Sequence, residues 1–285
     1  MESMLTLGLV QMSIASGDVA RNRATAERMT IEAAQRGAQL VALPEFFLTA
    51  GTMRPKKELA ETIPGPATEH FGALAKRLGI HLIMGSIVER DPRDGNLYNT
   101  SVVLDDRGSI IGQYRKRHLW CSEVGQITPA NSASVIQTPW GGLGLLICWD
   151  LAFSYLAQEE ARGGARIIVC CAHWQANDRY GPHDPFGPAG RQIPDDDRVE
   201  ERFVDVCSAA RAWENGVVFA FVNPWGDTSL RGLKPNRRIG HSQIHAPFHG
   251  LVGMAEDSEH VLVRKVDLSI AETAEVAYGL RKPGW

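Results

Sequence analysis

The sequence lacks both a long apolar run and a concentration of basic residues, and each absence excludes a class of protein. No stretch of the 285 residues approaches the roughly 18 consecutive apolar residues that are needed to cross a bilayer. The net charge is -3, and no lysine- and arginine-rich surface is indicated, so we expect no nucleic-acid partner and no membrane association. The first apolar stretch carries Glu2 and is interrupted by Gln11, so we expect no signal peptide.

Cysteine is also scarce. The five cysteines are an odd number and none forms a Cys-x-x-Cys pair, so neither a disulfide framework nor a zinc site is indicated. Such a set of thiols suits a reducing compartment, and we expect a cytoplasmic protein. Hydrophobic residues make up 44% of the chain and no linker divides it, so we expect one domain over residues 1–285.

Hydrophobic periodicity predicts strands and helices that alternate along the chain. The predicted strands are 4–12, 39–43, 80–88, 101–104, 109–114, 134–138, 142–147, 166–171, 217–222, 241–245, 251–254 and 260–266. The predicted helices are 20–36, 68–78, 151–162 and 199–215, and the pattern after Ala274 is indistinct. Both halves have a similar element order, so we expect an α/β fold with two mixed sheets packed face to face and helices outside, a four-layer α-β-β-α sandwich.

The most informative stretch is 142–151, where an apolar run stops at Cys148 and is followed by Trp149 and Asp150. The pattern predicts a strand, a tight turn and then a helix. A cysteine on such a turn is lifted out of the sheet and lies near the amides of a helix N-terminus, which favours a thiolate nucleophile. The alternative is a buried cysteine that packs as a small apolar side chain.

Two further buried strands also stop at a reactive side chain, Glu45 after Pro44 and Lys116 within a basic pentapeptide. If the three strand ends meet, Glu45 can take the proton of Cys148, and the thiolate can attack a carbonyl or nitrile carbon. Lys116 and a turn amide then stabilise the oxyanion. Glu45 protonates the departing amine and later activates the water that hydrolyses the thioester. Taken singly, Glu45 and Lys116 are more often solvated surface charges than catalytic groups.

These stretches resemble the nitrilase superfamily of carbon–nitrogen hydrolases, and the resemblance covers most of the chain. The similar stretches are Leu43-Pro44-Glu45 for its glutamate motif, Tyr114 to Leu119 for its lysine motif, Gly144 to Asp150 for its nucleophile motif, and Arg211 to Asn215, Asn223, Gly240 to Ile244 and Pro247 for its second-half signatures. The resemblance implies an α-β-β-α sandwich, no metal or organic cofactor, and a small-molecule amide, carbamoyl or nitrile substrate. It also implies a homodimer or higher homo-oligomer packed across helices near the nucleophile.

The superfamily has a second glutamate that positions the substrate and the lysine, and Glu123 stands where it is expected. Glu123 follows Lys116 by seven residues, as in short-loop aliphatic amidases and formamidases, and the preceding pair Trp120-Cys121 is similar to those enzymes too. An ordinary loop carboxylate is the alternative for Glu123.

The sequence departs from the family pattern at three places, and the first two narrow the expected substrate. Leu151-Ala152-Phe153-Ser154 replaces the usual Arg-Phe-Pro-Glu, so the arginine that D-carbamoylases use for a substrate carboxylate is absent. Asp150 stands where true nitrilases have glutamate, and Ala130 replaces a glycine. The best match is a small neutral amide whose hydrolysis releases ammonia, with N-carbamoyl amidohydrolase and nitrilase as alternatives.

The substrate pocket is expected to include Trp149, His173 and Trp174. His173 and Trp174 precede a polar loop at 175–197, whose length favours a role in shaping the pocket. The two tryptophans are equally compatible with the core.

Other chemistries remain open from the residues alone. Cys121 is a rival nucleophile, but it lacks the strand-turn-helix setting. A papain-like pair would use His173 or His241 as the base for Cys148. His241, His245 and His249 recur every four residues, as zinc ligands on a helix would. Pro247 lies among them and disfavours a helix, so a zinc site here is disfavoured.

Two further interpretations involve no catalysis: cysteines that only pack in the core, and a chain that has lost its activity. Cys170 and Cys171 fall in one predicted strand, point to opposite faces and are expected to pack in the core. A scaffold that has lost activity should also have lost a catalytic side chain, whereas Glu45, Lys116 and Cys148 are all present.

Overall fold

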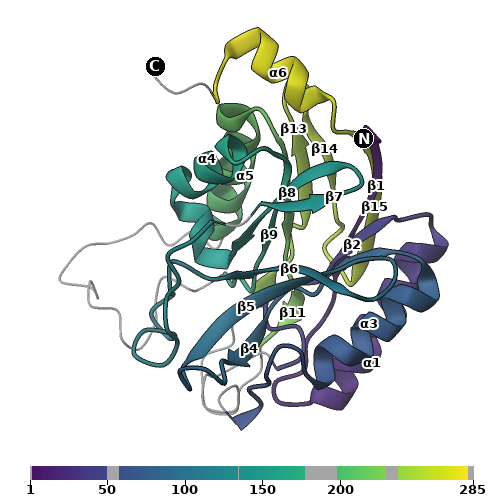
Figure 1. The fold of residues 1–285 in the computed structure, drawn as a ribbon, viewed down its shortest axis with the longest axis vertical. Coiled ribbons are helices and arrows are strands. Elements are labelled where there is room, and N and C mark those ends of the chain that lie inside the picture. Colours follow the sequence, from purple (N-terminus) through teal and green to yellow (C-terminus); the bar gives the residue numbers. More distant parts are fainter. Residues whose placement is uncertain (1, 50–57, 134, 177–197, 229–236, 282–285) are drawn as a thin grey trace.

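Strands fill the interior of the molecule and helices cover its two outer faces, as the ribbon in Figure 1 shows. The computed structural model describes residues 2–49, 58–133, 135–176, 198–228 and 237–281. Within these ranges, no helix combines the length and the apolar character that a membrane span requires. The layers are helix, sheet, sheet and helix, so the predicted α-β-β-α sandwich is confirmed.

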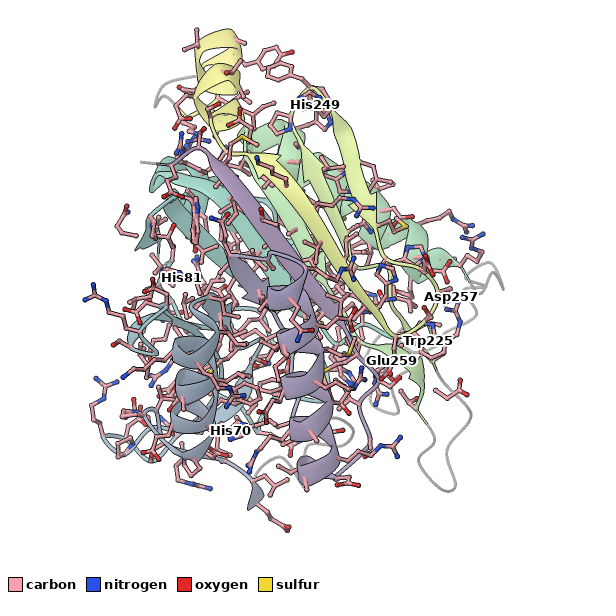
Figure 2. The ribbon with its side chains drawn as sticks, turned by 90° about the vertical axis from the view of Figure 1, so that its right-hand side faces the viewer. His70, His81, Trp225, His249, Asp257 and Glu259 are labelled. Carbon is pink, nitrogen blue, oxygen red and sulfur yellow. The ribbon has the colours of Figure 1, made fainter. Side chains whose placement is uncertain are left out.

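The first sheet has seven strands and carries two helices on its outer face. Its order is β15 (His260–Asp267), β1 (Met4–Gln11), β2 (Leu40–Ala42), β3 (His81–Ile83), β5 (Leu97–Leu104) and β4 (Ile87–Arg90), with β6 (Ile110–Arg115) paired to β5. Strands β1, β2 and β3 are parallel and the other pairs are antiparallel. Helices α1 (Val19–Gln35) and α3 (Pro66–Leu78) lie over this sheet in Figure 2.

The second sheet has six strands and is covered by the helices that flank the nucleophile stretch. Its order is β14 (Gly250–Met254), β13 (Gln243–Ala246), β10 (Val218–Val222), β9 (Ala165–Cys171), β8 (Gly141–Ile147) and β7 (Ile136–Thr138). Helices α4 (Ser154–Arg162) and α5 (Val199–Asn215) pack on its outer face, on the opposite side of the molecule from α1 and α3 (Figure 1).

The side-chain alternation of β1 divides the core between the layers. Leu5, Leu7 and Leu9 are buried against the second sheet, in one cluster with residues of β8, β9 and β10. Val10 belongs to the cluster beneath α1 and α3. A strand with both faces buried is continuously apolar, which is why the sequence pattern of β1 alternates only loosely.

The prediction of a single strand over 80–88 was wrong. The structure has two strands, β3 and β4, separated by a bend at Gly85, which has φ 55°. A Cβ on Gly85 would lie 2.0 Å from the carbonyl oxygen of Pro44, the residue before Glu45. Only glycine allows the chain to pass this close to the Glu45 turn, so the bend is set by tertiary packing that periodicity does not report.

Four other elements differ from the sequence-based expectation. A 3-10 helix, Cys148–Ala152, separates β8 from α4, whereas a helix was predicted to begin at Leu151. The tail forms α6 (Ile270–Tyr278), and the short strands β11 (Trp225–Asp227) and β12 (Arg237–Ile239) form a separate ribbon. At the start of β11, the indole N–H of Trp225 donates to Asp257 at 2.7 Å, and Figure 2 labels both residues.

We expect Gly85→Ala to lower the free energy of unfolding by about 3 kcal/mol or more, because a left-handed φ and a backbone collision add together. Gly79→Ala is the matched control, since Gly79 has φ 65° but no atom within 4 Å of an added Cβ. This control should lose only about 1–2 kcal/mol. Urea titration of both variants measures the difference, and equal losses would contradict the close approach to Pro44.

Candidate active site

Cys148 begins the 3-10 helix that follows β8, and its backbone is strained. Its φ is 49°, in the left-handed region that non-glycine residues adopt at a cost of about 1–3 kcal/mol. The side chain is 8% exposed. The guanidinium of Arg211, on α5, donates from Nη2 to the carbonyl oxygen of Leu151 at 2.9 Å. The surrounding structure therefore holds this turn in a conformation that the chain alone disfavours.

Asp150 connects the nucleophile turn to the end of β6. Its buried carboxylate accepts hydrogen bonds from the Ile147 N–H at 3.1 Å, the Tyr114 hydroxyl at 2.8 Å and the His118 N–H at 2.8 Å. Ile147 precedes Cys148, whereas Tyr114 and His118 flank the segment that carries Lys116. One carboxylate thus fixes two strand ends relative to each other.

Glu45 lies just beyond β2, and its backbone is held by both sheets. Its N–H donates to the carbonyl oxygen of Ala172, at the end of β9, at 3.0 Å. The next residue, Phe46, has φ 51° and donates its N–H to the Ser86 hydroxyl at 3.2 Å. The Glu45 side chain is 2% exposed. The carboxyl group therefore points into the interior and is not a solvated loop charge.

The Lys116 ammonium lies between two carboxyl groups. Its Nζ contacts Glu45 Oε1 at 2.9 Å and Glu123 Oε2 at 2.7 Å, and all three side chains are at most 2% exposed. Asn99 Nδ2 donates to Glu45 at 2.7 Å and to Glu123 at 2.8 Å, and the Trp120 N–H donates to Glu123 at 2.8 Å. Buried charges persist only with such partners, so the group behaves as one unit.

The titration of Lys116 and Glu123 reflects this mutual contact. Burial by itself would lower the pKa of Lys116, but the charges of Glu123, Glu45 and Cys148 raise it well above its usual value. Burial would raise the pKa of Glu123, but the charge and hydrogen bond of Lys116 lower it. Lys116 is therefore a cation and Glu123 an anion at neutral pH. Because the Cys148 sulfur contributes to the shift at Lys116, the thiol lies within electrostatic reach of the ammonium.

Trp149 and Trp174 belong to one aromatic cluster. The Trp149 ring lies 4.7 Å from Trp120, 5.8 Å from Trp174 and 6.4 Å from Phe203, between centroids. Trp174 is buried, its Nε1 donates to Glu200 at 2.7 Å, and its backbone N–H donates to Asn223 Oδ1 at 2.6 Å. Packing is thus established for both tryptophans, while substrate contact remains a prediction.

The third predicted binding residue, His173, accepts a hydrogen bond at Nε2 from Arg238 Nε at 3.0 Å. The polar loop that follows falls mostly at 177–197, outside the described residues. Its first residues, Gln175 and Ala176, pair with β12. The role expected for the loop therefore remains a prediction.

The rival cysteines have different surroundings from Cys148. Cys121 lies on a turn at 121–126, after the Lys116 segment, and is partly exposed. Cys170 and Cys171 are fully buried in β9, and burial raises the pKa of both thiols, which suits core packing. None of the five cysteines, all within the described ranges, forms a disulfide.

The histidines of the zinc alternative fall in strand and turn positions. His245 lies on β13, and the ring of His241 contacts Asp205 at 3.0 Å. No group of three metal-ligating side chains occurs within the described ranges. The second ring nitrogen of His241, Nε2, lies 3.6 Å from Glu201, so both nitrogens face carboxylates on α5.

Asn99 and Asp150 are the contacts of this site that sequence reasoning missed. Asn99 lies in the part of β5 that precedes the predicted strand at 101–104, and a lone amide within an apolar strand was the available signal. Asp150 was considered only as a family marker, although its three acceptor contacts hold the turn together.

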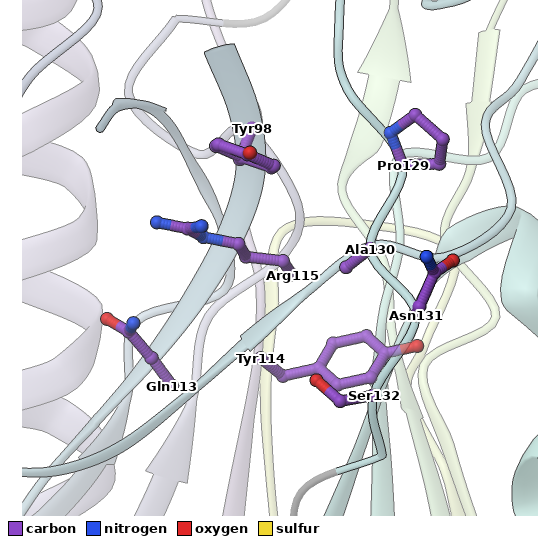
Figure 3. Close-up of a pocket in the computed structure, with 8 residues that line it drawn as sticks. All are labelled: Tyr98, Gln113, Tyr114, Arg115, Pro129, Ala130, Asn131 and Ser132. Atoms are coloured by element: carbon purple, nitrogen blue, oxygen red, sulfur yellow. The ribbon is translucent and has the colours of Figure 1, made fainter. Parts of the chain in front are cut away.

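A separate cavity of about 340 Å³ lies beside the end of β6 and is shown in Figure 3. Its lining residues are Tyr98, Gln113, Tyr114, Arg115, Pro129, Ala130, Asn131 and Ser132. The Arg115 guanidinium is neutralised there by Glu89 and Asp91. None of Glu45, Lys116 and Glu123 lines this cavity, so it is distinct from the ion cluster.

Comparison with known proteins finds relatives that cover most of the chain. A model of the carbon–nitrogen hydrolase family matches residues 6–275. The omega-amidase of Xenopus tropicalis is 33% identical over 279 residues, which are 94% of this chain and 91% of the relative. A carbon–nitrogen hydrolase from Helicobacter pylori has the same fold, with a TM-score of 0.85, 21% identity and coverage of 99% of this chain and 95% of the other. A nitrilase-superfamily protein of Saccharomyces cerevisiae has a TM-score of 0.80, 24% identity and coverage of 99% and 96%.

We expect Lys116→Met to lower the free energy of unfolding by about 3–5 kcal/mol near pH 7, because two buried carboxyl groups lose their cation. The lowered pKa of Glu123 contributes stability above its unfolded-state pKa of about 4.3, and this contribution is lost as pH falls through the lower folded-state pKa. The difference between wild type and variant should therefore shrink below about pH 4. Denaturant titrations across this range test it, and a difference that is independent of pH would indicate lost packing alone.

Proposed function

The chain belongs to the carbon–nitrogen hydrolase family, and from this premise we propose that it hydrolyses a small linear amide through a thioester on Cys148. The observation that carries the proposal is the buried Glu45–Lys116–Glu123 cluster at the strand ends next to the Cys148 turn. The omega-amidase relatives favour an amide over the N-carbamoyl and nitrile alternatives.

In the proposed first half-reaction, Glu45 accepts the thiol proton and the Cys148 sulfur bonds to the amide carbon. The developing oxyanion is stabilised by the Lys116 ammonium and a backbone N–H of the Cys148 turn. The C–N bond then breaks, Glu45 returns the proton to the nitrogen, and ammonia leaves a thioester on Cys148.

In the second half-reaction, Glu45 takes a proton from water, whose oxygen attacks the thioester carbon. The C–S bond breaks, the product acid leaves, and the Glu45 proton returns to sulfur. Glu123 and Asn99 hold the Lys116 and Glu45 side chains in position during both half-reactions. Asn99 donates to Glu45 and to Glu123, and Lys116 donates to Glu123. These steps use only side chains, backbone amides and water, so we propose no cofactor.

A catalytically silent scaffold is the non-enzyme alternative. The ion cluster argues against it, because burying three ionisable groups is costly and a protein without the reaction gains nothing from keeping them next to a strained cysteine.

We also propose a homodimer or higher oligomer that packs across the helices near the nucleophile. Tyr155 on α4 and Val206 and Trp213 on α5 are large apolar side chains that are 44%, 67% and 41% exposed on this face. Cysteines that form no disulfide suit a reducing compartment, and we propose a cytoplasmic location.

Cys148→Ala should reduce ammonia release from a panel of small amides by at least about 10³-fold, because it removes the nucleophile. Cys121→Ala is the matched control and should retain wild-type rates. Intact-protein mass spectrometry during turnover should detect an acyl adduct in the wild type and none in Cys148→Ala. Substrate-dependent ammonia that survives Cys148→Ala would refute the mechanism.

Val206→Asp should shift the protein toward monomer in sedimentation velocity, because it places a charge at the centre of the proposed contact. Val276→Asp, at a 90% exposed position on α6, is the control and should leave the distribution unchanged. A monomeric wild type, or an unaltered Val206→Asp distribution, rules out this contact.

A further inference from the structure

A second group of charged side chains lies next to Lys116 in the first sheet. Glu89, on β4, accepts hydrogen bonds from the Thr100 hydroxyl at 2.6 Å and from Arg115 Nε at 2.8 Å, and it also pairs with Arg115 Nη2. The same Nη2 contacts Asp91 at 2.7 Å. Glu89 is 3% exposed and Thr100 is fully buried. We call Glu89, Asp91, Thr100 and Arg115 the second cluster, to separate it from the ion cluster around Lys116.

The two clusters use alternate residues of the same two chain segments. Thr100 pairs with Arg115 across β5 and β6, and the Lys116 N–H donates to the carbonyl oxygen of Asn99 at 2.8 Å. Asn99 and Lys116 face the ion cluster. Thr100 and Arg115, each one residue away, face Glu89. Because successive side chains of a strand point to opposite faces, the two clusters lie back to back across the sheet.

Arg115 is held by an aromatic ring as well as by the two acids. Its guanidinium carbon lies 3.8 Å from the centre of the Tyr98 ring, and Figure 3 labels both residues. Burial by itself would lower the pKa of Arg115, but its hydrogen bonds to Glu89 and Asp91 raise it, so the side chain is a cation at neutral pH. A guanidinium that meets a carboxylate through two nitrogens is fixed in direction as well as in charge. Glu89 therefore holds the end of β6 in one position.

The turn between β5 and β6 does not by itself decide which face Lys116 occupies. The register shifts between Val103 and Leu104 of β5, where Ile111 of β6 is an extra residue. Because side chains alternate with a period of two, such a bulge reverses the face of every side chain that follows it. The contacts of Glu89 lie beyond the bulge, where they hold the reversed register.

We propose that Glu89 is a positioning residue for catalysis, which acts through Arg115 to hold Lys116 in the ion cluster. Glu89 touches neither Cys148 nor Lys116, and its contribution is the strand register that they require. This proposal rests on the proposed amide hydrolysis, in which Lys116 stabilises the oxyanion. The oxyanion develops only as the carbon is attacked, so a displaced Lys116 lowers kcat and leaves KM nearly unchanged.

Glu89→Gln tests the proposal, because it keeps the size of the side chain and removes the charge that Thr100 and Arg115 contact. It should lower kcat for a small amide by about 10- to 100-fold, the loss that a displacement of about 1 Å can cause. Arg115→Met should cause a similar loss, and Arg115→Lys should recover part of it. Arg93→Gln is the matched control, since Arg93 also pairs with Asp91 but is 77% exposed and lies outside β5 and β6. This control should keep the wild-type kcat.

Two measurements separate a displaced Lys116 from a loss of folded protein. Rates are compared under conditions in which urea titration shows each variant to be folded, and the destabilised Gly79→Ala variant should keep the wild-type kcat. A crystal structure of Glu89→Gln should show Lys116 Nζ further from Glu45 or Glu123 than the 2.9 Å and 2.7 Å of the wild type.

A wild-type kcat in both Glu89→Gln and Arg115→Met, or a raised KM with an unchanged kcat, overturns the positioning role and leaves the proposed function intact. An equal loss of kcat in Gly79→Ala also overturns it, because destabilisation alone then explains the effect. A wild type that hydrolyses no amide refutes the proposed function instead. The crystal structure then decides whether Glu89 places Lys116, and an unmoved Lys116 refutes that too. If Glu89→Gln does not fold, Thr100→Val, which removes only the hydroxyl contact, should lower kcat in the same direction.

Discussion

The arrangement of the whole molecule depends on one ammonium held between two carboxyl groups out of contact with water. Lys116, Glu45 and Glu123 are stable in the interior only because each satisfies the others, with Asn99 bridging the two acids. The three charged residues come from the ends of β2 and β6 and from the turn that follows, so the strand ends must converge for the cluster to form. The two sheets, their register and the Asp150 contacts are the framework that this convergence requires.

The parts of this framework that the sequence reveals are those with a local pattern. The abrupt stops at Glu45, Lys116 and Cys148 marked strand ends, and the sandwich followed from the alternation of apolar segments. The parts that it does not reveal arise between distant segments. The bend at Gly85 exists because the chain passes the carbonyl of Pro44, and Asn99 matters because it lies opposite two acids that are 54 and 24 residues away. Neither contact leaves a periodicity, and α6 carries a pattern too short to distinguish from a loop.

The contrast between Arg237 and Arg238 illustrates how the direction of a side chain decides its contacts. Both are arginines on a three-residue strand whose existence the sequence did not indicate. One pairs with α5, and the other lies in the interior beside His173. The family resemblance addresses the reacting groups, which come from the three strand-end motifs, whereas β12 lies outside those motifs.

The pairing of β1 with β15 has a consequence for how the protein is made. The two strands are antiparallel over eight residues, from Met4 opposite Asp267 to Gln11 opposite His260. On a ribosome, β1 emerges long before β15, so this edge of the first sheet cannot close until β15 has been translated. Such delayed pairing slows folding and leaves an apolar strand exposed to chaperones and to other nascent chains. The nucleophile turn is therefore synthesised well before the sheet that carries its carboxylate can be completed.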